Sequence, residues 1–189
     1  MSPLETLHRQ KAGHYEILGE TYAKFEFFEH GWNPYSRFLD VDKVDLILRR
    51  RALAGRVYRE VQVKYGRLWT ISPDAGQLWE RSLFDRTSWR FFRPDEFDAS
   101  GVDAELFIAY ILAGEEGYRG DIFIFPVADF IRMIGAAIPI SDGRRKVYIS
   151  RVRGSDRWIV RRKNRFSAVA ETTALDVTAY RRNFAVLEP

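Results

Sequence analysis

Acidic, amide and lysine side chains fall at alternate positions in neighbouring segments that have the pattern of β-strands. Asp45 lies in the first segment, and Glu60, Gln62 and Lys64 lie in the second, with valines between them. Successive side chains of a strand point to opposite faces, so the three polar residues of the second segment share one face. A carboxylate, an amide oxygen and a lysine gathered there suit a metal ion beside a phosphate. The alternative is an amphipathic hairpin with a solvated polar face.

The surrounding sequence predicts a helix followed by strands that would position these residues. Apolar side chains of residues 13–30 recur at spacings of three and four, which predicts a helix. Glu16 and Glu20 would lie on one face of it, and an exposed position is the alternative for each. Residues 44–50 and 57–65 predict two strands joined by a loop, and an earlier strand through residues 36–39 is a further candidate.

The rest of the chain predicts more strands and helices. Residues 73–101 mix aromatic residues with arginines, and we interpret them as a loop held by aromatic packing, with nucleic-acid contact as the alternative. After this loop we expect two buried strands, a helix, a basic β-hairpin and a C-terminal helix, at residues 106–112, 121–127, 128–137, 146–163 and 174–187. The fold class is therefore α/β, with a mixed sheet flanked by helices.

Composition excludes several classes of protein. With 189 residues, 46% of them hydrophobic, the chain is long and apolar enough for one domain with a substantial core. It has no cysteine, which excludes disulfides, thiolate zinc sites and a cysteine nucleophile. The N-terminus lacks a signal pattern, and the longest apolar run, 134–140, is too short to span a bilayer. We therefore expect a soluble, cytoplasmic protein without a membrane partner.

The charge is unevenly distributed along the chain. Residues 141–189 hold 12 Lys and Arg against 5 Asp and Glu, whereas residues 1–140 hold 18 against 21. Arginine supplies 24 of the 30 basic residues, and its planar guanidinium suits bidentate phosphate contacts. We expect a core domain over 1–140 and a basic hairpin and helix over 141–189 packed on it, a charge distribution that a nucleic-acid enzyme could use. The alternative is a solvated arginine-rich surface.

In order and placement, these residues resemble the motif of the PD-(D/E)xK nuclease superfamily. The matching residues are a glutamate in the first helix (Glu20), an aspartate in a strand (Asp45) and a Gln-x-Lys in the next strand (Gln62 and Lys64). The resemblance covers residues 13–66 and, more loosely, 104–130. It implies a restriction-endonuclease-like mixed sheet flanked by helices, with an α-β-β-β-α-β core.

The resemblance also implies roles for the residues. Asp45 would be the principal ligand of Mg²⁺ or Mn²⁺, and Gln62 and the backbone carbonyl of Val63 would complete the protein ligands. Glu20 would reach the ion from the helix, and Lys64 would position the attacking water and offset phosphate charge. The common residue in place of Gln62 is an acid, and a glutamine brings no negative charge, which should weaken the hold on Mg²⁺. No proline precedes Asp45, where the family often has one.

DNA would be held mainly through its phosphates, and binding should weaken steeply with salt. The expected source of these contacts is the basic hairpin, through Arg151, Arg153, Arg157, Arg161, Arg162 and Lys163.

The sequence thus predicts a metal-dependent DNA endonuclease that hydrolyses phosphodiester bonds in defence, restriction or repair. A homodimer is a further expectation of the resemblance, because cutting two strands requires two sites. The alternatives are a non-catalytic DNA-binding relative and a structural or partner-binding α/β domain in which Asp45, Gln62 and Lys64 have no common task.

Overall fold

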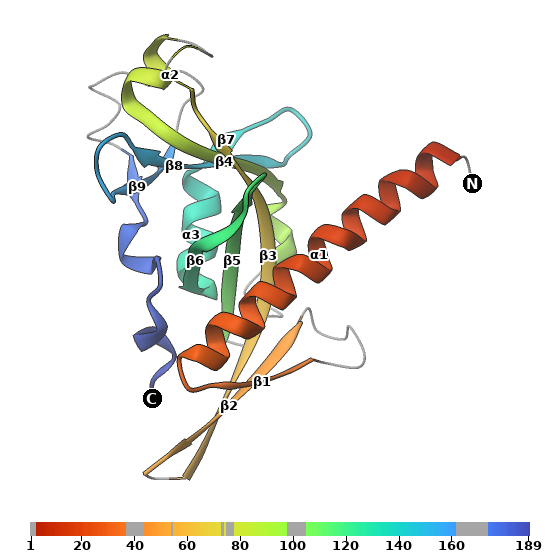
Figure 1. Ribbon diagram of the computed structural model, residues 1–189, viewed down its shortest axis with the longest axis vertical. Helices are drawn as coiled ribbons and strands as arrows, with labels where there is room; N and C mark the ends of the chain where they lie inside the picture. The colour runs from red at the N-terminus through yellow and green to blue at the C-terminus, as the bar shows by residue number, and fades with distance from the viewer. Residues whose placement is uncertain are drawn as a thin grey trace.

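The computed structural model describes residues 3–36, 44–53, 55–72, 74, 78–97, 105–161 and 174–189 (Figure 1). Its α-helices are α1 (Pro3–Glu29), α2 (Leu78–Leu83) and α3 (Val127–Ala136). Its 3-10 helices are η1 (Pro94–Phe97), η2 (Thr178–Tyr180) and η3 (Phe184–Leu187). Its strands are β1 (Asn33–Ser36), β2 (Leu46–Ala52), β3 (Gly55–Thr70), β4 (Phe84–Phe92), β5 (Leu106–Gly114), β6 (Gly117–Pro126), β7 (Ile138–Pro139), β8 (Arg145–Val152), β9 (Trp158–Arg161) and β10 (Leu175–Asp176).

The long strand β3 joins two parts of a mixed sheet. Its first part pairs antiparallel with β2, which in turn pairs antiparallel with β1. Along 60–67 it pairs with β5 in parallel, and its last residues, 68–70, pair antiparallel with β4. From β4 the sheet continues through β8 and β9 to β10, all antiparallel. This confirms the predicted fold class, a mixed α/β protein with a large, mostly antiparallel sheet flanked by helices.

Helices cover the sheet around β3 from its two faces. On one face, α1 packs through Ala23 and Phe27 into a cluster that includes Val61 of β3. On the other face, Phe130 of α3 lies in edge-to-face contact with Phe97 of η1, a geometry that aromatic pairs favour. Burial of these two apolar clusters fixes β3 between α1 and η1, which is the framework of the site described below.

Several elements confirm the sequence interpretation. The helix predicted over 13–30 forms as the C-terminal part of α1 and ends before Gly31, whose φ of 79° suits a residue without a side chain. The two apolar segments form β5 and β6, the next helix forms α3, and the basic hairpin forms β8 and β9. Among the described residues, no helix is both long and apolar enough to cross a membrane.

Two segments before residue 105 differ from the sequence interpretation. Residues 73–101 are not simply a loop, because they include α2, β4 and η1. β4 pairs with β3 on one side and with β8 on the other, so this part of the segment is an interior strand of the sheet. The strand expected over 36–39 is instead β1, which ends at Ser36, and residues 37–39 lie outside the described residues.

The prediction of a C-terminal α-helix over 174–187 is also wrong. The segment forms the short strand β10 and two 3-10 helices. The carboxylate of Asp176 accepts a hydrogen bond from the backbone N–H of Thr178 at 2.9 Å, and the Thr178 hydroxyl bonds to the backbone of Trp158. Such local side-chain bonds compete with helix formation.

Candidate active site

A cleft lies along the part of the β3 edge that extends beyond its pairing with β2. β2 begins at Leu46, which pairs with Val61, while β3 continues for nine more residues to Thr70. The edge of β3 beyond Val61 is therefore left without β2 as its neighbour. The cleft has a volume of about 560 Å³ and is lined by Tyr15, Glu16, Asp45, Gln62, Val63, Lys64, Tyr65, Gly66, Arg67, Trp89, Arg90 and Glu96.

Asp45 occupies the start of this uncovered edge. Its backbone N–H donates to the carbonyl of Val61 at 3.0 Å, and its Oδ2 accepts a hydrogen bond from the N–H of Val63 at 2.6 Å. Because the N–H and C=O of one strand residue point to the same side, the carbonyl of Val63 also faces the cleft edge. The next carbonyl on that edge belongs to Tyr65, and it accepts a hydrogen bond from the guanidinium of Arg90 at 2.6 Å.

Gln62 is buried beside this edge with an unsatisfied oxygen. The residue is 6% exposed, and its Oε1 has no hydrogen-bond partner among the described residues. A buried acceptor without a partner costs about 1–3 kcal/mol, so its retention calls for an explanation. An amide oxygen is a ligand that Mg²⁺ accepts, and the Gln62 Oε1, the Val63 carbonyl and Asp45 form an oxygen donor set of the kind this ion prefers.

The donor set carries little negative charge. Among the described residues, no group of three or more His, Cys, Asp or Glu side chains is placed to hold a metal ion. A metal at this cleft would therefore depend on Asp45 as its charged ligand and on uncharged oxygens from Gln62 and Val63. These residues fit a weakly held, largely hydrated Mg²⁺ or Mn²⁺ rather than a tightly caged ion.

This low charge leads to a prediction for Gln62. If Gln62 is a ligand of the Mg²⁺ expected from the sequence, Gln62→Glu should lower the Mg²⁺ concentration that gives half-maximal cleavage by about tenfold or more, because it adds a second charged ligand of nearly the same size. Metal titrations of cleavage rate would measure the shift. Gln62→Met, which removes the oxygen and keeps the volume, is the matched control and should raise the required concentration. An unchanged titration for both variants would exclude Gln62 as a ligand.

Lys64 lies on the same face of β3 as Gln62. Its side chain is 12% exposed, and its Nζ lies 3.3 Å from Oε1 of Glu96 and 5.4 Å from the centre of the Phe97 ring. Both partners belong to η1, so the packing of η1 determines where the ammonium group sits. The sequence did not indicate Glu96, because it falls within the segment interpreted as a loop.

The helix α1 contributes Glu16 rather than Glu20 to the cleft. Glu20 lies 3.4 Å from Lys24 of the same helix and is not among the lining residues, whereas Glu16, one turn earlier, is. Gly19 allows this close approach of helix to strand, since a Cβ there would lie 3.1 Å from the Cβ of Tyr65. Tyr65 stacks on the ring of Tyr15 at 5.2 Å, and burial raises its pKa.

We therefore expect different effects from the two glutamates. Glu16→Gln should reduce cleavage about tenfold or more if its carboxylate binds the ion or its water shell, because it removes the charge and keeps the shape. Glu20→Gln is the matched control and should stay close to wild type. Cleavage rates at limiting Mg²⁺ would separate them, and a larger loss for Glu20 would restore the assignment made from the sequence.

Comparisons with known proteins give one structural neighbour. No protein-family model matches the chain, and no curated protein of similar sequence was found. The chain is similar in structure to I-Ssp6803I, a bacterial homing endonuclease. The two share 16% sequence identity, with 92% of this chain and 89% of that chain covered and a TM-score of 0.44. At this level of similarity we base function on the cleft itself.

The arginines of the β8–β9 hairpin are engaged within the protein. Arg161 is 2% exposed and lies 2.7 Å from Glu80 of α2, and burial lowers the pKa of its guanidinium. Arg151 makes two hydrogen bonds to the carboxylate of Asp85, at 2.8 and 2.7 Å. Both Nη groups of Arg161 are therefore engaged inside the protein, which leaves little of the side chain for the phosphate contact predicted from the sequence.

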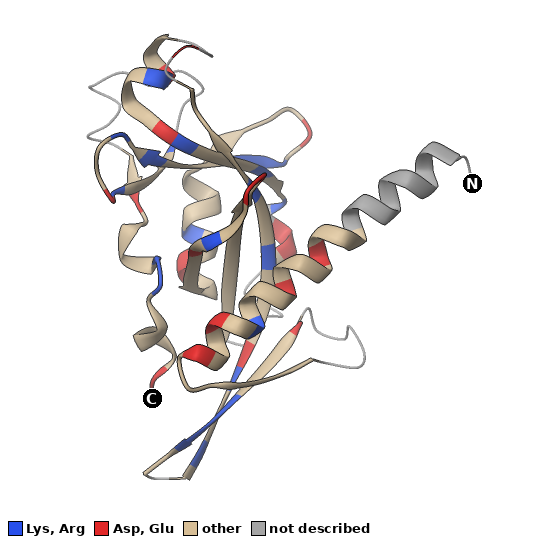
Figure 2. Cartoon of the chain, in the orientation of Figure 1, with Lys and Arg blue, Asp and Glu red and all other residues tan. Residues whose placement is uncertain are grey.

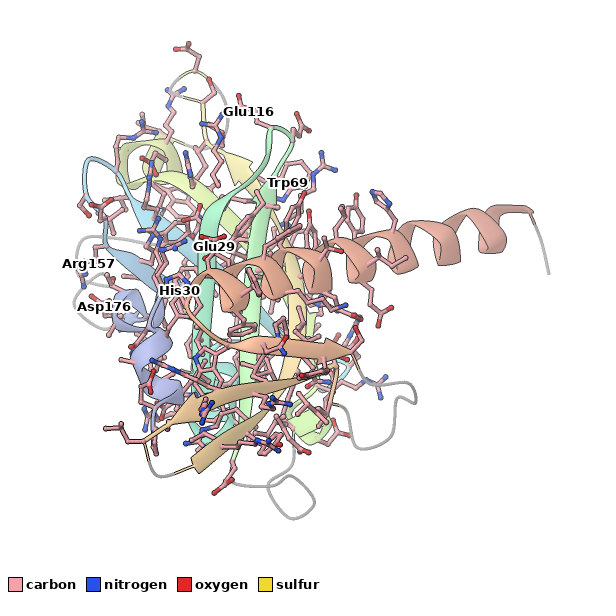
Figure 3. The ribbon with its side chains drawn as sticks, turned by 60° about the horizontal axis from the view of Figure 1, so that its bottom comes forward. Glu29, His30, Trp69, Glu116, Arg157 and Asp176 are labelled. Atoms are coloured by element: carbon pink, nitrogen blue, oxygen red, sulfur yellow. The ribbon has the colours of Figure 1, made fainter. Side chains whose placement is uncertain are left out.

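Two of the other arginines in that prediction also have partners within the protein. The guanidinium of Arg153 donates to the backbone carbonyls of Arg81, Ile71 and Phe84, which joins the hairpin to α2 and β4. Arg157 is paired with Asp176 at 2.8 Å, and Figure 3 shows the two side by side. Arg162 and Lys163 lie outside the described residues.

Glu60, the third polar residue that the sequence places on the face of Gln62 and Lys64, lies on β3 opposite Ile47 and is not among the residues that line the cleft. The structure thus brings Asp45, Gln62, Val63 and Lys64 to one cleft and leaves Glu20 and Glu60 outside its lining.

Proposed function

We propose that the protein is a Mg²⁺-dependent endonuclease that hydrolyses phosphodiester bonds of DNA, with Mn²⁺ as a substitute ion. The observation that carries this proposal is the buried, unpartnered Oε1 of Gln62, a residue that lines the cleft together with Asp45 and Lys64. The same three residues were the ones whose order in the sequence resembles the PD-(D/E)xK motif. A role in defence, restriction or repair fits this chemistry.

Each residue would have a distinct task. Asp45, Gln62 and the carbonyl of Val63 would hold the ion, which supplies Lewis acidity and a water of lowered pKa when bound. Lys64 would orient the attacking water and offset the charge that develops on the phosphate. The attacking water loses a proton to solvent as its oxygen forms a bond to phosphorus, the bond to the leaving sugar oxygen breaks, and that oxygen takes up a proton from solvent. Arg67, at the cleft wall, supplies further positive charge.

A non-catalytic DNA-binding function is the second candidate. It is favoured by the low charge of the donor set, since no group of three or more His, Cys, Asp or Glu side chains converges among the described residues. Such a protein would bind DNA in a salt-dependent way and would leave it intact at every metal concentration.

A cleavage panel distinguishes the two candidates. Supercoiled plasmid, linear duplex, branched DNA and single strands would be incubated with the protein and Mg²⁺ or Mn²⁺, and chelation with EDTA should abolish cutting. An Asp45→Ala protein purified in the same way is the control for a contaminating nuclease and should be inactive. Binding without cutting of any substrate would support the second candidate. Cutting by Asp45→Ala at the wild-type rate would contradict our assignment of the site.

A further inference from the structure

The β2–β3 hairpin carries arginines on both of its faces. Figure 2 shows basic residues, in blue, along this hairpin, which projects from the rest of the sheet. Residues directly opposite in an antiparallel pair share a face. Arg51 pairs with Arg56 and Arg49 pairs with Tyr58, so these four residues lie on one face. Arg50 and Arg59 lie on the other.

The two faces differ in what their arginines bind. Arg50 is ion-paired with Glu188, and the Nε of Arg59 donates to the carbonyl of Leu187 at 3.0 Å, so this face holds the C-terminal segment. Arg51 and Arg56 are exposed and make no ion pair or hydrogen bond with any residue that the structure describes. Arg49 has a neutral partner, the Tyr35 hydroxyl, at 3.4 Å.

The face with unpaired arginines is also the face of the candidate active site. Alternate residues of β3 share a face, so Arg56 and Tyr58 continue the row that contains Glu60, Gln62 and Lys64. From Arg56 to Gln62 the strand extends about 20 Å. Cationic side chains near the hairpin tip thus follow the same surface toward the cleft, with Glu60 as the acidic residue between them.

We propose that this face of the β2–β3 hairpin, formed by Arg49, Arg51, Arg56 and Tyr58, is an arm that binds duplex DNA through its phosphates. The inference rests on the proposed function, because it places the arm relative to the phosphate at the cleft. A two-stranded β-ribbon fits the major groove of B-DNA, and arginine donates to phosphate oxygens in a bidentate manner. With about 3.4 Å between base pairs, the contacts would lie about six base pairs from the cut.

The test compares duplex binding by wild type with that by an Arg51→Ala/Arg56→Ala protein, in EDTA so that no cleavage intervenes. Each lost phosphate contact reduces by about one unit the slope of the logarithm of the association constant against the logarithm of the salt concentration. The double variant should therefore lose about two units of slope, and it should bind the duplex roughly tenfold more weakly than wild type. Arg51→Lys/Arg56→Lys should retain the slope. Because the two side chains are exposed, thermal unfolding should be unchanged, which controls for folding.

Arg119→Ala is the matched control for loss of an exposed arginine. Arg119 is ion-paired with Glu116, which lies in the turn between β5 and β6. The last residue of β5 that pairs with β3 lies opposite Arg67, and the turn follows directly after it. This turn is therefore at the end of the sheet far from the hairpin tip, and Figure 3 shows Glu116 there. The slope for Arg119→Ala should equal that of wild type.

The outcomes separate the arm from the nuclease. An unchanged slope for the double variant, with cutting by wild type, would overturn the arm and keep the proposed function. The predicted loss of slope, without cutting by wild type, would support the arm and contradict the nuclease. Cutting of single strands without binding of duplex would also overturn the arm.

Discussion

Lys64→Met should lower the rate of DNA cleavage by about 10²–10⁴-fold, the range typical of a positioned group that assists proton transfer. The substitution removes the ammonium group and keeps most of the side-chain length. The loss should fall on kcat, because Lys64 lies at the cleft and not on the surface proposed to hold the duplex, and the Kd for DNA should stay close to wild type. Single-turnover rates at saturating enzyme and filter-binding measurements would give the two quantities.

Lys64→Arg is the informative control. If the role of Lys64 is to supply positive charge to the phosphate, arginine should recover most of the rate. If the role is to orient a water, the planar guanidinium should not recover it, because its donors are fixed in a different geometry. Glu96, the ion-pair partner, is partly exposed at 36%, so loss of the pair should change the free energy of unfolding by less than about 1 kcal/mol. A kcat for Lys64→Met equal to that of wild type would exclude Lys64 from the chemistry.

The strand part of the site was predictable because its geometry is local. Alternation along a strand depends only on the backbone, so Gln62 and Lys64 share a face wherever the strand is placed. The sequence placed Asp45 within the preceding strand, and in the structure it lies immediately before that strand, which begins at Leu46. The buried state of the Gln62 oxygen was not predictable, because burial depends on tertiary packing, and three residues that line the cleft, Trp89, Arg90 and Glu96, belong to the segment interpreted as a loop.

The contribution of the helix was harder to predict because a sequence does not fix how a helix is rotated and shifted against a sheet. Glu16 and Glu20 share one helical face and are equivalent by spacing alone. The contact of Gly19 with Tyr65 and the stacking of Tyr15 on Tyr65 select the register of α1 on β3. These are tertiary contacts, and they place Glu16 at the cleft.

Arginine content, likewise, did not indicate which arginines are available to DNA. Arg161 in the basic C-terminal quarter is enclosed, whereas Arg51 in the acidic part of the chain is exposed. The difference arises from partners. Arg161 is paired with Glu80 on α2, which the sequence interpretation missed, whereas the residue opposite Arg51 on β3 is another arginine, Arg56. Net charge over a segment describes neither burial nor pairing.

The enclosed Arg161 leads to the second large prediction. Glu80→Ala should lower the free energy of unfolding by about 3 kcal/mol, because it leaves the charge of a buried guanidinium without its carboxylate. Arg161 also donates to the hydroxyls of Ser150 and Thr87, at 2.8 and 3.0 Å, and its guanidinium lies 4.5 Å from the centre of the Phe84 ring. These contacts hold the charge in place when the ion pair is lost, so the charge cannot move to solvent. Urea denaturation would measure the change.

Removing both charges should cost less than removing one. In Glu80→Ala/Arg161→Met the buried charge is gone and the side-chain volume is largely kept, so the double variant should be more stable than Glu80→Ala alone. Glu116→Ala is the control, since its pair with Arg119 is exposed and should contribute less than about 1 kcal/mol. If Arg161 instead reached solvent and DNA, Glu80→Ala would leave stability unchanged and Arg161→Met would reduce the salt dependence of DNA binding. If Arg161 has a structural role, Glu80→Ala should lower the free energy of unfolding and Arg161→Met should leave the salt dependence of DNA binding unchanged.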